Sequence, residues 1–302
     1  MADVDFVPPL TEAEKAEWEE IKVNILKEDG KLDRIDKLEH EVIVRFIRGS
    51  EFVKDKQKRM DRVVQTLNDY LAWADRINLD SILYRKYPKA GKFRETMWPL
   101  KYFGKTEEKG HAVFLLRLKE SKLKEAAALF SGDELIEYIV FTMEIMLRTL
   151  KAWKCSSRSI IIFDCMGMGM ADYYTAYKAG LPKVLSLLGE YYPEFLEKFY
   201  AINAPAIFTW CYSVMKPFIQ PDTVRKINII RNRNTALSKL KESGVDLQRL
   251  PPDLVEGGLD LFDYKISDKV ISLQTSPEVD EQVGEKVLDL INSRIVTHKR
   301  GS

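Results

Sequence analysis

The stretch Ser159–Asp164, SIIIFD, decides the fold. Its apolar residues are consecutive and do not alternate with polar ones, which is typical of a strand buried on both faces in a parallel sheet. Outward from it, strands are expected at Ala112–Leu116, Phe199–Ala204 and Val224–Ile230, and helices at Asp133–Trp153, about 172–190 and 206–218. Strands that alternate with helices predict an α/β layer with a largely parallel sheet.

The segment before this layer is predicted to be helical. Thr11-Glu-Ala-Glu14 is a capping box that opens a helix stopped by Gly30. A short helix containing Val42, Ile43, Phe46 and Ile47 ends at Gly49, and an amphipathic helix is expected over about 54–76 from the spacing of Met60, Val63, Val64, Leu67 and Leu71. At the other end, Leu250–Gly258 has turn chemistry, and a last helix carries Val283, Val287, Leu288 and Ile291.

Composition excludes several classes of protein. The chain has 302 residues, of which 45% are hydrophobic, so it can bury a sizeable core. Its net charge of +1 gives no reason to expect a nucleic-acid partner. The acidic start lacks the apolar core of a secretory signal, and no apolar run approaches the ~20 residues of a membrane span. Cys155, Cys165 and Cys211 lack CxxC spacing, so we expect reduced thiols in a cytosolic protein and no metal site.

Motifs for catalysis are weak. Gly167-Met-Gly169-Met-Ala-Asp172 follows a strand and opens a helix, but a dinucleotide site needs glycine where Asp172 stands, and Asp164 adds negative charge there. A tight turn is the better interpretation, and the methionines at 166, 168 and 170 fit either a core or a lining for a flexible ligand. His40, His111 and His298 lie far apart in the sequence. We therefore assign no catalytic residue and expect a protein that is not an enzyme; a nicotinamide-dependent oxidoreductase is the enzyme alternative.

Five segments together resemble the CRAL-TRIO lipid-binding family, closest to its phosphatidylinositol/phosphatidylcholine transfer branch. They are VRFIRGSEF (44–52), SIIIFDCMG (159–167), YYPEFLEKFYAINAP (191–205), KPFIQPDTVRKINII (216–230) and LPPDLVEGG (250–258). The resemblance runs from about Glu39 to Gly258 and implies a helical N-terminal unit, residues 1–88 with a core at about 35–80. Beside it would stand a lipid-binding domain, 89–262, whose mostly parallel sheet floors an apolar pocket closed by a helical gate, followed by a C-terminal extension, 263–302, with a helix.

The resemblance also implies roles for individual residues. The gate falls on the apolar run Ile207, Phe208, Trp210, Tyr212, Val214, Met215 and Phe218. Family positions that contact the phosphatidylinositol headgroup are Glu194, Thr223 and Lys226 here. The family's headgroup arginine falls at Ser50, which leaves Arg48 as the candidate substitute. Residues 216–241 carry Lys216, Arg225, Lys226, Arg231, Arg233, Lys239 and Lys241 against one acid, Asp222, a balance suited to an anionic membrane.

The phosphatidylcholine side of the family pattern is altered. Tyrosines of that branch become Phe114 and Met143, a threonine becomes Ile161, and Ser159 is the remaining hydroxyl near Phe163 in the expected pocket lining. Loss of hydroxyls disfavours a buried choline phosphate, because its oxygens would lack partners. A second ligand, if bound, is expected to be less polar than phosphatidylcholine.

The sequence thus predicts a cytosolic lipid-binding protein that exchanges one phospholipid, phosphatidylinositol, between membranes or presents it to a lipid kinase. It would touch an anionic membrane surface transiently, act as a monomer as the family does, and need no cofactor besides the lipid. Two alternatives stay open: a carrier of a less polar ligand such as a tocopherol, retinoid or sterol, and an interaction module that recruits partners to membranes without transfer.

Overall fold

A five-stranded sheet with strand order β1-β2-β3-β4-β5 lies at the centre of the molecule. The strands are β1 (Leu100–Lys105), β2 (Ala112–Arg117), β3 (Ser159–Asp164), β4 (Leu196–Ile202) and β5 (Ile227–Ile229). Only the β1–β2 pair is antiparallel, and β2 to β5 pair in parallel. The computed structural model describes residues 5–25, 35, 38–261 and 285–290. The predicted α/β fold with a mostly parallel sheet is confirmed.

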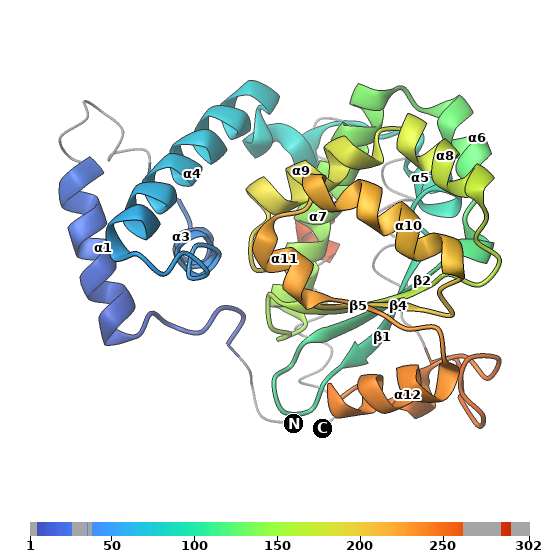
Figure 1. The fold of residues 1–302 in the computed structure, drawn as a ribbon. Coiled ribbons are helices and arrows are strands. Elements are labelled where there is room, and N and C mark those ends of the chain that lie inside the picture. Colours follow the sequence, from blue (N-terminus) through green and yellow to red (C-terminus); the bar gives the residue numbers. More distant parts are fainter. Residues whose placement is uncertain (1–4, 26–34, 36–37, 262–284, 291–302) are drawn as a thin grey trace.

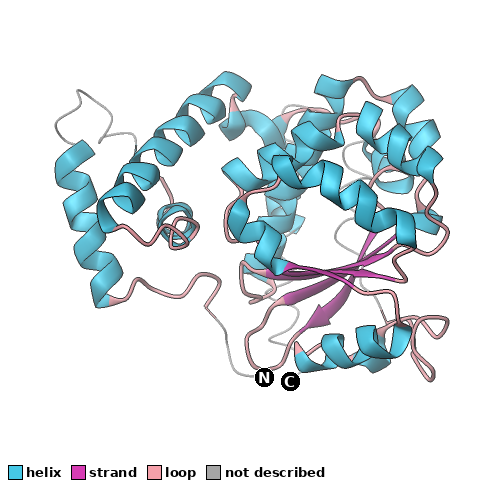
Figure 2. Ribbon diagram, in the orientation of Figure 1, coloured by secondary structure: helices cyan, strands magenta, loops and turns pink. Residues whose placement is uncertain are grey.

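Helices cover both faces of this sheet, which is why the interior of β3, residues 160–163, is apolar on both sides (Figure 2). Ile160 and Ile162 on β3 are fully buried in one cluster with Ala236 and Leu240 of α12 (Arg233–Glu242). The opposite face is covered by α7 (Gly132–Ala152), α8 (Met170–Lys178), α9 (Leu181–Tyr191), α10 (Ala206–Met215) and α11 (Pro221–Lys226) (Figure 1). Shorter elements are α5 (Ala90–Thr96), α6 (Leu123–Leu129) and the 3₁₀ helices η1 (Leu79–Tyr84), η2 (Leu118–Glu120), η3 (Lys216–Phe218) and η4 (Leu247–Arg249).

Two predicted elements are wrong. The single helix expected over 172–190 is two helices, because Gly180 adopts φ 102 and Pro182 then starts α9. The strand expected at Val224–Ile230 is mostly helix, because Pro221 stands in the first turn of α11 and only 227–229 pair with β4. The third strand also ends before its predicted limit, at Ile202, where Asn203 turns left-handed with φ 50. β1 and α12 lie in segments for which no element was predicted.

The N-terminal unit consists of α1 (Glu12–Ile25), α3 (His40–Arg48) and α4 (Lys56–Ile77). The predicted capping box at Thr11 is present, since the backbone N–H of Glu14 donates to Oγ1 of Thr11 and the N–H of Thr11 donates to the Glu14 carboxylate. The predicted stop at Gly30 lies outside the described residues. The helix before Gly49 and the amphipathic helix are confirmed, and Asp55 caps the latter by accepting from the N–H of Lys58.

The N-terminal unit and the α/β layer share one hydrophobic core. Residues of α3, α4, α7 and α9 belong to the same buried cluster, and Trp73 of α4 stacks on Tyr191 with ring centroids 4.2 Å apart. Val287, in a helical segment at 285–290, is buried in this cluster too. Of the other residues predicted for the last helix, Val283 and Ile291 lie outside the described residues.

A substitution at Gly49 tests how tightly the N-terminal unit packs against the α/β layer. A Cβ at position 49 would stand 2.8 Å from Cβ of Pro193, a rigid ring that cannot move aside freely. Gly49→Ala is therefore expected to lower the free energy of unfolding by about 1–3 kcal/mol, measured by urea denaturation. Gly132→Ala, where a new Cβ meets nothing within 4 Å, is the matched control. Equal stability of the two variants would show that the joint is not tightly packed.

Candidate functional site

Parallel strands bring polar residues together at both edges of the sheet. Arg158 directly precedes β3, Lys226 directly precedes β5, and Glu194 stands two residues before β4. Since β2 to β5 run in the same direction, their amino ends share one edge and their carboxyl ends share the other. The first edge collects an ion-pair chain, and the second collects a network beside the start of α10.

The ion pairs at the amino edge form an alternating chain of five residues: Glu197, Arg158, Glu194, Lys226 and Asp222, called here the amino-edge cluster. One oxygen of Glu194 accepts from Nζ of Lys226 at 2.9 Å, and the other accepts from Nη2 of Arg158. Nη1 of Arg158 lies 3.2 Å from Glu197, and Nζ of Lys226 lies 2.7 Å from Asp222. Burial opposes the charge of Lys226, but Glu194 and Asp222 outweigh it and raise the pKa of that ammonium.

Glu194 is the centre of this cluster. Its side chain is only 6% exposed, and its backbone adopts φ 59, the left-handed conformation that non-glycine residues rarely take. Such a conformation persists where surrounding contacts hold it, and it gathers at functional sites. The two ion pairs of Glu194 are contacts of that kind.

Of the residues predicted for the headgroup, the structure brings Glu194 and Lys226 into contact. Thr223 lies on α11, three positions before Lys226 and therefore on the same side of that helix. Sequence reasoning missed Arg158 and Asp222. The i, i+4 spacing of Asp222 and Lys226 would have indicated their ion pair once a helix was recognised there.

Arg48, by contrast, binds the N-terminal segment. Its guanidinium donates to Glu14 at 2.7 Å and to the carbonyls of Pro8 and Pro9 at 3.0 and 2.9 Å. The hydrogen bond from Arg48 lowers the pKa of Glu14 to about 2. Ser50 is buried, and its hydroxyl donates to the carbonyl of Phe46. Neither residue makes a direct contact with the amino-edge cluster that the structure describes.

The predicted pocket residues lie on one side of the sheet. Ser159, Ile161 and Phe163 alternate along β3 and point to the side of α7 to α10, and Phe114 pairs with Ile161. Phe114, Ser159 and Met143 of α7 are buried. Ile161 and Phe163 stay half-buried, as do their neighbours Leu116, Phe199 and Ile229 on the same face.

The opposite face of the same strands shows the contrast. There Val113, Leu115, Ile160, Ile162, Tyr200 and Ile202 are all buried in one cluster. The apolar side chains of the inner face are thus more accessible than those of the outer face, which are fully buried.

A separate groove of about 260 Å³ lies between α4 and α9. Its lining includes Asp69, Arg76 and Glu190 beside Trp73 and Tyr191. Because charged groups line so much of it, this groove does not fit the acyl chains of a lipid.

The predicted gate is α10 with η3, and most of its residues are apolar. Its inward side chains close the layer: Phe208 packs 6.2 Å from the ring of Phe163, and Cys211 and Met215 are buried against Tyr173. Ile207 joins the same cluster, and Tyr212 is half-buried. Trp210, Val214 and Phe218 are exposed to solvent, with Trp210 at 51%.

Helix α8 extends this exposed apolar side. It lies beside α10 (Figure 1), and Trp210 packs edge-on against Tyr173 with ring centroids 5.7 Å apart. Met170, Tyr174 and Tyr177 of α8 are exposed at i, i+4 and i+7, and Met166 is exposed just before the helix. We call these residues, together with Trp210, Val214 and Phe218, the exposed apolar surface. Met166 and Met170 are therefore not core residues, so the interpretation that placed them in a core is wrong for these two.

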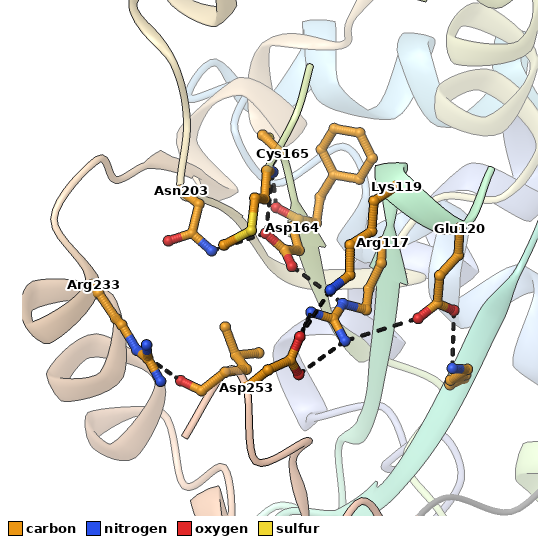
Figure 3. Close-up of polar contacts among 12 residues, drawn as sticks. Arg117, Lys119, Glu120, Asp164, Cys165, Asn203, Arg233 and Asp253 are labelled. Atoms are coloured by element: carbon orange, nitrogen blue, oxygen red, sulfur yellow. Dashed lines mark hydrogen bonds and ion pairs between the residues drawn. The ribbon is translucent and has the colours of Figure 1, made fainter. Parts of the chain in front are cut away.

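The carboxyl edge of the sheet holds the start of the gate in place. The buried carboxylate of Asp164 accepts from Nε of Arg117 at 3.2 Å, from the N–H of Met166 at 3.2 Å and from Nδ2 of Asn203 at 2.8 Å (Figure 3). Arg117 also donates to Asp253 at 2.6 Å. Asn203 leads into α10 and Met166 leads into α8, so one carboxylate fixes the entry to both helices.

The remaining candidates for chemistry serve structure. Gly167 adopts φ 84, as a tight turn requires, and Asp172 accepts from the N–H of Gly169 at the start of α8. All three cysteines are buried free thiols. Within the part of the chain that the structure describes, no cluster of histidine, cysteine and carboxylate side chains could bind a metal ion, and no helix is long and apolar enough to cross a membrane.

Comparison with known proteins agrees with this geometry. The model of the CRAL/TRIO domain family matches residues 100–252. The Sec14 cytosolic factor of Schizosaccharomyces pombe is 24% identical over 232 residues, 74% of either chain. The phosphatidylinositol/phosphatidylcholine transfer protein SFH7 of Arabidopsis thaliana is 26% identical over 221 residues, which are 70% of this chain but only 38% of that protein. The crystal structure of Sfh5 has the same fold, with a TM-score of 0.59 at 21% identity over 96% of this chain and 99% of that one.

Asp164 provides a test of the network at the carboxyl edge. Asp164→Asn removes the buried charge opposite Arg117 and is expected to lower the free energy of unfolding by about 3 kcal/mol, measured by urea denaturation. Asp253→Asn alters the half-exposed partner of the same arginine and is expected to cost about 1 kcal/mol or less. The reverse order of the two losses would contradict the central place given to Asp164.

Proposed function

The chain belongs to the CRAL/TRIO domain family, and from that premise we propose that it binds one phospholipid, phosphatidylinositol, and exchanges it between membranes or presents it to a lipid kinase. The observation that carries the proposal is the combination of an accessible apolar inner face of the sheet with a buried carboxylate and two cations at its edge. The names of the S. pombe and Arabidopsis relatives support the same ligand class.

Energetics require such an inner face. Each CH₂ group that moves from an apolar environment into water costs about 0.8 kcal/mol, so a two-chain lipid leaves a bilayer only if the protein replaces nearly all of its apolar contacts. Phe163 and Phe199 present apolar surface toward α10, and Ile161 lies on the same face of the sheet. In the proposed complex the acyl chains lie against this surface, and Phe208 covers them.

The headgroup would lie at the amino-edge cluster. The Lys226 ammonium suits the phosphodiester, Glu194 accepts from inositol hydroxyls, and the hydroxyl of Thr223 donates to phosphate. Arg48 contributes at longer range, because it already interacts electrostatically with Glu194 while its hydrogen bonds go to the N-terminal segment. No covalent step is needed in this cycle.

Membrane contact would use the exposed apolar surface. Its tryptophan and tyrosines suit the interface between headgroups and acyl chains. Lys216 and Arg225 are exposed nearby, and Arg231 donates to Thr209 of α10, so three cations of the basic stretch lie close to the gate. Arg233 and Lys239 are bound elsewhere, to the carbonyl of Leu254 and to Glu242. The contact proposed is peripheral and transient.

One observation favours a second, less polar ligand. The hydroxyl of Ser159 is buried and has no hydrogen-bond partner among the described residues, while Phe114, Met143 and Ile161 around the inner face offer no polar group. A buried hydroxyl without a partner is costly, and a ligand with a single hydroxyl or carbonyl would satisfy it. A tocopherol-, retinoid- or sterol-like ligand has this chemistry.

Lys226→Ala tests the headgroup assignment. Purified protein is incubated with mixed phosphatidylcholine and phosphatidylinositol vesicles, and the co-purifying lipid is identified by mass spectrometry. The variant is expected to take up at least about tenfold less phosphatidylinositol, a loss of ~1.4 kcal/mol, while remaining folded because Arg158 still neutralises Glu194. Lys239→Ala, which removes an exposed ion-paired lysine on α12, is the control. Unchanged uptake in Lys226→Ala would remove the assignment.

Trp210→Ala tests the membrane contact. Loss of a large apolar side chain that enters the interface is expected to weaken binding to anionic vesicles about tenfold or more, measured by co-sedimentation, because burial of such a side chain is worth ~1.5–3 kcal/mol. Leu259→Ala, which shortens an exposed apolar side chain far along the chain from α8 and α10, is expected to bind as the wild type does. An equal loss of vesicle binding in both variants would show that α10 has no specific role in membrane contact.

A further inference from the structure

We propose that Arg158 is a second phosphate-binding cation of this site, and that it holds the phosphodiester of the lipid headgroup together with Lys226. The inference rests on the proposed function and adds a residue that the family resemblance does not assign. It follows from the position of Arg158 at the amino edge of the sheet, from its accessibility, and from an unusual histidine behind it.

Arg158 and Lys226 bind the two oxygens of the same carboxylate, that of Glu194. A phosphodiester placed at Glu194 therefore meets a cation on either side. The Arg158 side chain is 36% exposed, against 30% for Asp222 and 17% for Lys226, so it is the most accessible side chain of the cluster and a headgroup can reach it from solvent. Its planar fork of donors matches two phosphate oxygens, as an ammonium does not.

The absence of an arginine at Ser50, where the family has its headgroup arginine, also favours Arg158. Ser50 is buried with its hydroxyl on the carbonyl of Phe46, and the donors of Arg48 are bound to Glu14, Pro8 and Pro9. A headgroup phosphate at Glu194 would thus find no guanidinium from this helix. Arg158 supplies one from the strand side of the same carboxylate, and it interacts electrostatically with Glu51 just after that helix.

When a phosphate binds at the amino-edge cluster, the net negative charge there increases and a further cation is needed. Glu197, Glu194 and Asp222 carry three negative charges against the two positive charges of Arg158 and Lys226. When Arg158 turns to a phosphate, Glu197 loses its guanidinium partner. An uncompensated carboxylate in a half-buried position is unfavourable, so a second cation near Glu197 would aid binding.

His111 is placed to become that cation. Its side chain is 9% exposed, and its Nε2 lies 4.0 Å from the Glu197 carboxylate. Burial lowers the pKa of His111 and the charges of Arg158 and Lys109 lower it further, whereas the Glu197 carboxylate and a hydrogen bond with the backbone of Arg158 raise it. In the ligand-free protein the ring is therefore neutral at pH 7, and withdrawal of the guanidinium toward a phosphate favours its protonation.

Binding of the headgroup is thus linked to uptake of one proton. The pKa of His111 is higher in the complex than in the free protein, so there is a pH range in which His111 is protonated in the complex but neutral in the free protein. In that range protonation of His111 stabilises the complex. Affinity for phosphatidylinositol is then greatest at low pH and falls as pH rises through the pKa of His111 in the complex.

The experiment uses the full chain with Arg158→Gln, Arg158→Lys and a matched control, Arg148→Gln. Arg148 is 39% exposed and bound to a buried carboxylate, Glu144, on α7, so its loss imitates the structural part of the change. Uptake is measured from phosphatidylcholine vesicles that contain phosphatidylinositol or diacylglycerol. We expect at least about tenfold less phosphatidylinositol in Arg158→Gln, a partial loss in Arg158→Lys, and unchanged uptake of diacylglycerol in all.

The outcomes distinguish phosphatidylinositol binding by the protein from the role of Arg158 in that binding. Wild-type protein that takes up no phosphatidylinositol overturns the proposed function and this inference with it. Normal uptake in wild type and an equal uptake in Arg158→Gln overturns only the role of Arg158. Glycerophosphoinositol, the same headgroup without acyl chains, is expected to compete with uptake less well in Arg158→Gln than in wild type, and equal competition would place Arg158 outside the headgroup contact.

A pH profile tests the proton linkage. Uptake of phosphatidylinositol by wild type is expected to be about threefold or more greater at pH 6 than at pH 8, and His111→Gln is expected to flatten this profile. A wild-type profile that is already flat between these values would overturn the linkage without any need for the variant.

Discussion

The parallel pairing of β2, β3, β4 and β5 is the constraint on which the other features depend. It aligns the amino ends of the strands, so that Arg158, Glu194 and Lys226 meet although they are far apart in the sequence. It aligns the carboxyl ends as well, where Asp164 holds the entries to α8 and α10. It also requires helices on both faces, and here the apolar side chains of one face are all buried while several on the other face stay half-buried.

Much of this fold could be predicted from local patterns. Consecutive apolar residues at 159–164 identified the central strand at its observed limits, and apolar spacing identified α3 and α4. The errors have local causes: Gly180 breaks a continuous apolar periodicity, and Pro221 starts a helix within residues of high strand propensity. β1 and α12 were not predicted because they bury few residues. α12 buries only Ala236 and Leu240, too few to show a helical period.

The candidate site could be predicted only in part. Glu194 and Lys226 came from the resemblance, and their contact agrees with it. The ion pairs of Arg158 with Glu194 and of Arg48 with Glu14 join residues 36 and 34 positions apart, and no spacing rule predicts such pairs before the fold is known. The surroundings of His111 are likewise a product of tertiary packing, because its neighbours come from another strand and from the turn before β3.

The shared core of the N-terminal helices and the α/β layer has a mechanical consequence. Trp73, Tyr191 and Val287 belong to one buried cluster built from distant parts of the chain, so separating those parts would uncover apolar surface all at once. α10 and η3 lie outside that cluster: the buried residues of α10, Cys211 and Met215, belong to a small separate group, and η3 has no buried residue. Displacing these two elements would therefore leave the main core covered, and the cost of such a displacement would not include the shared core.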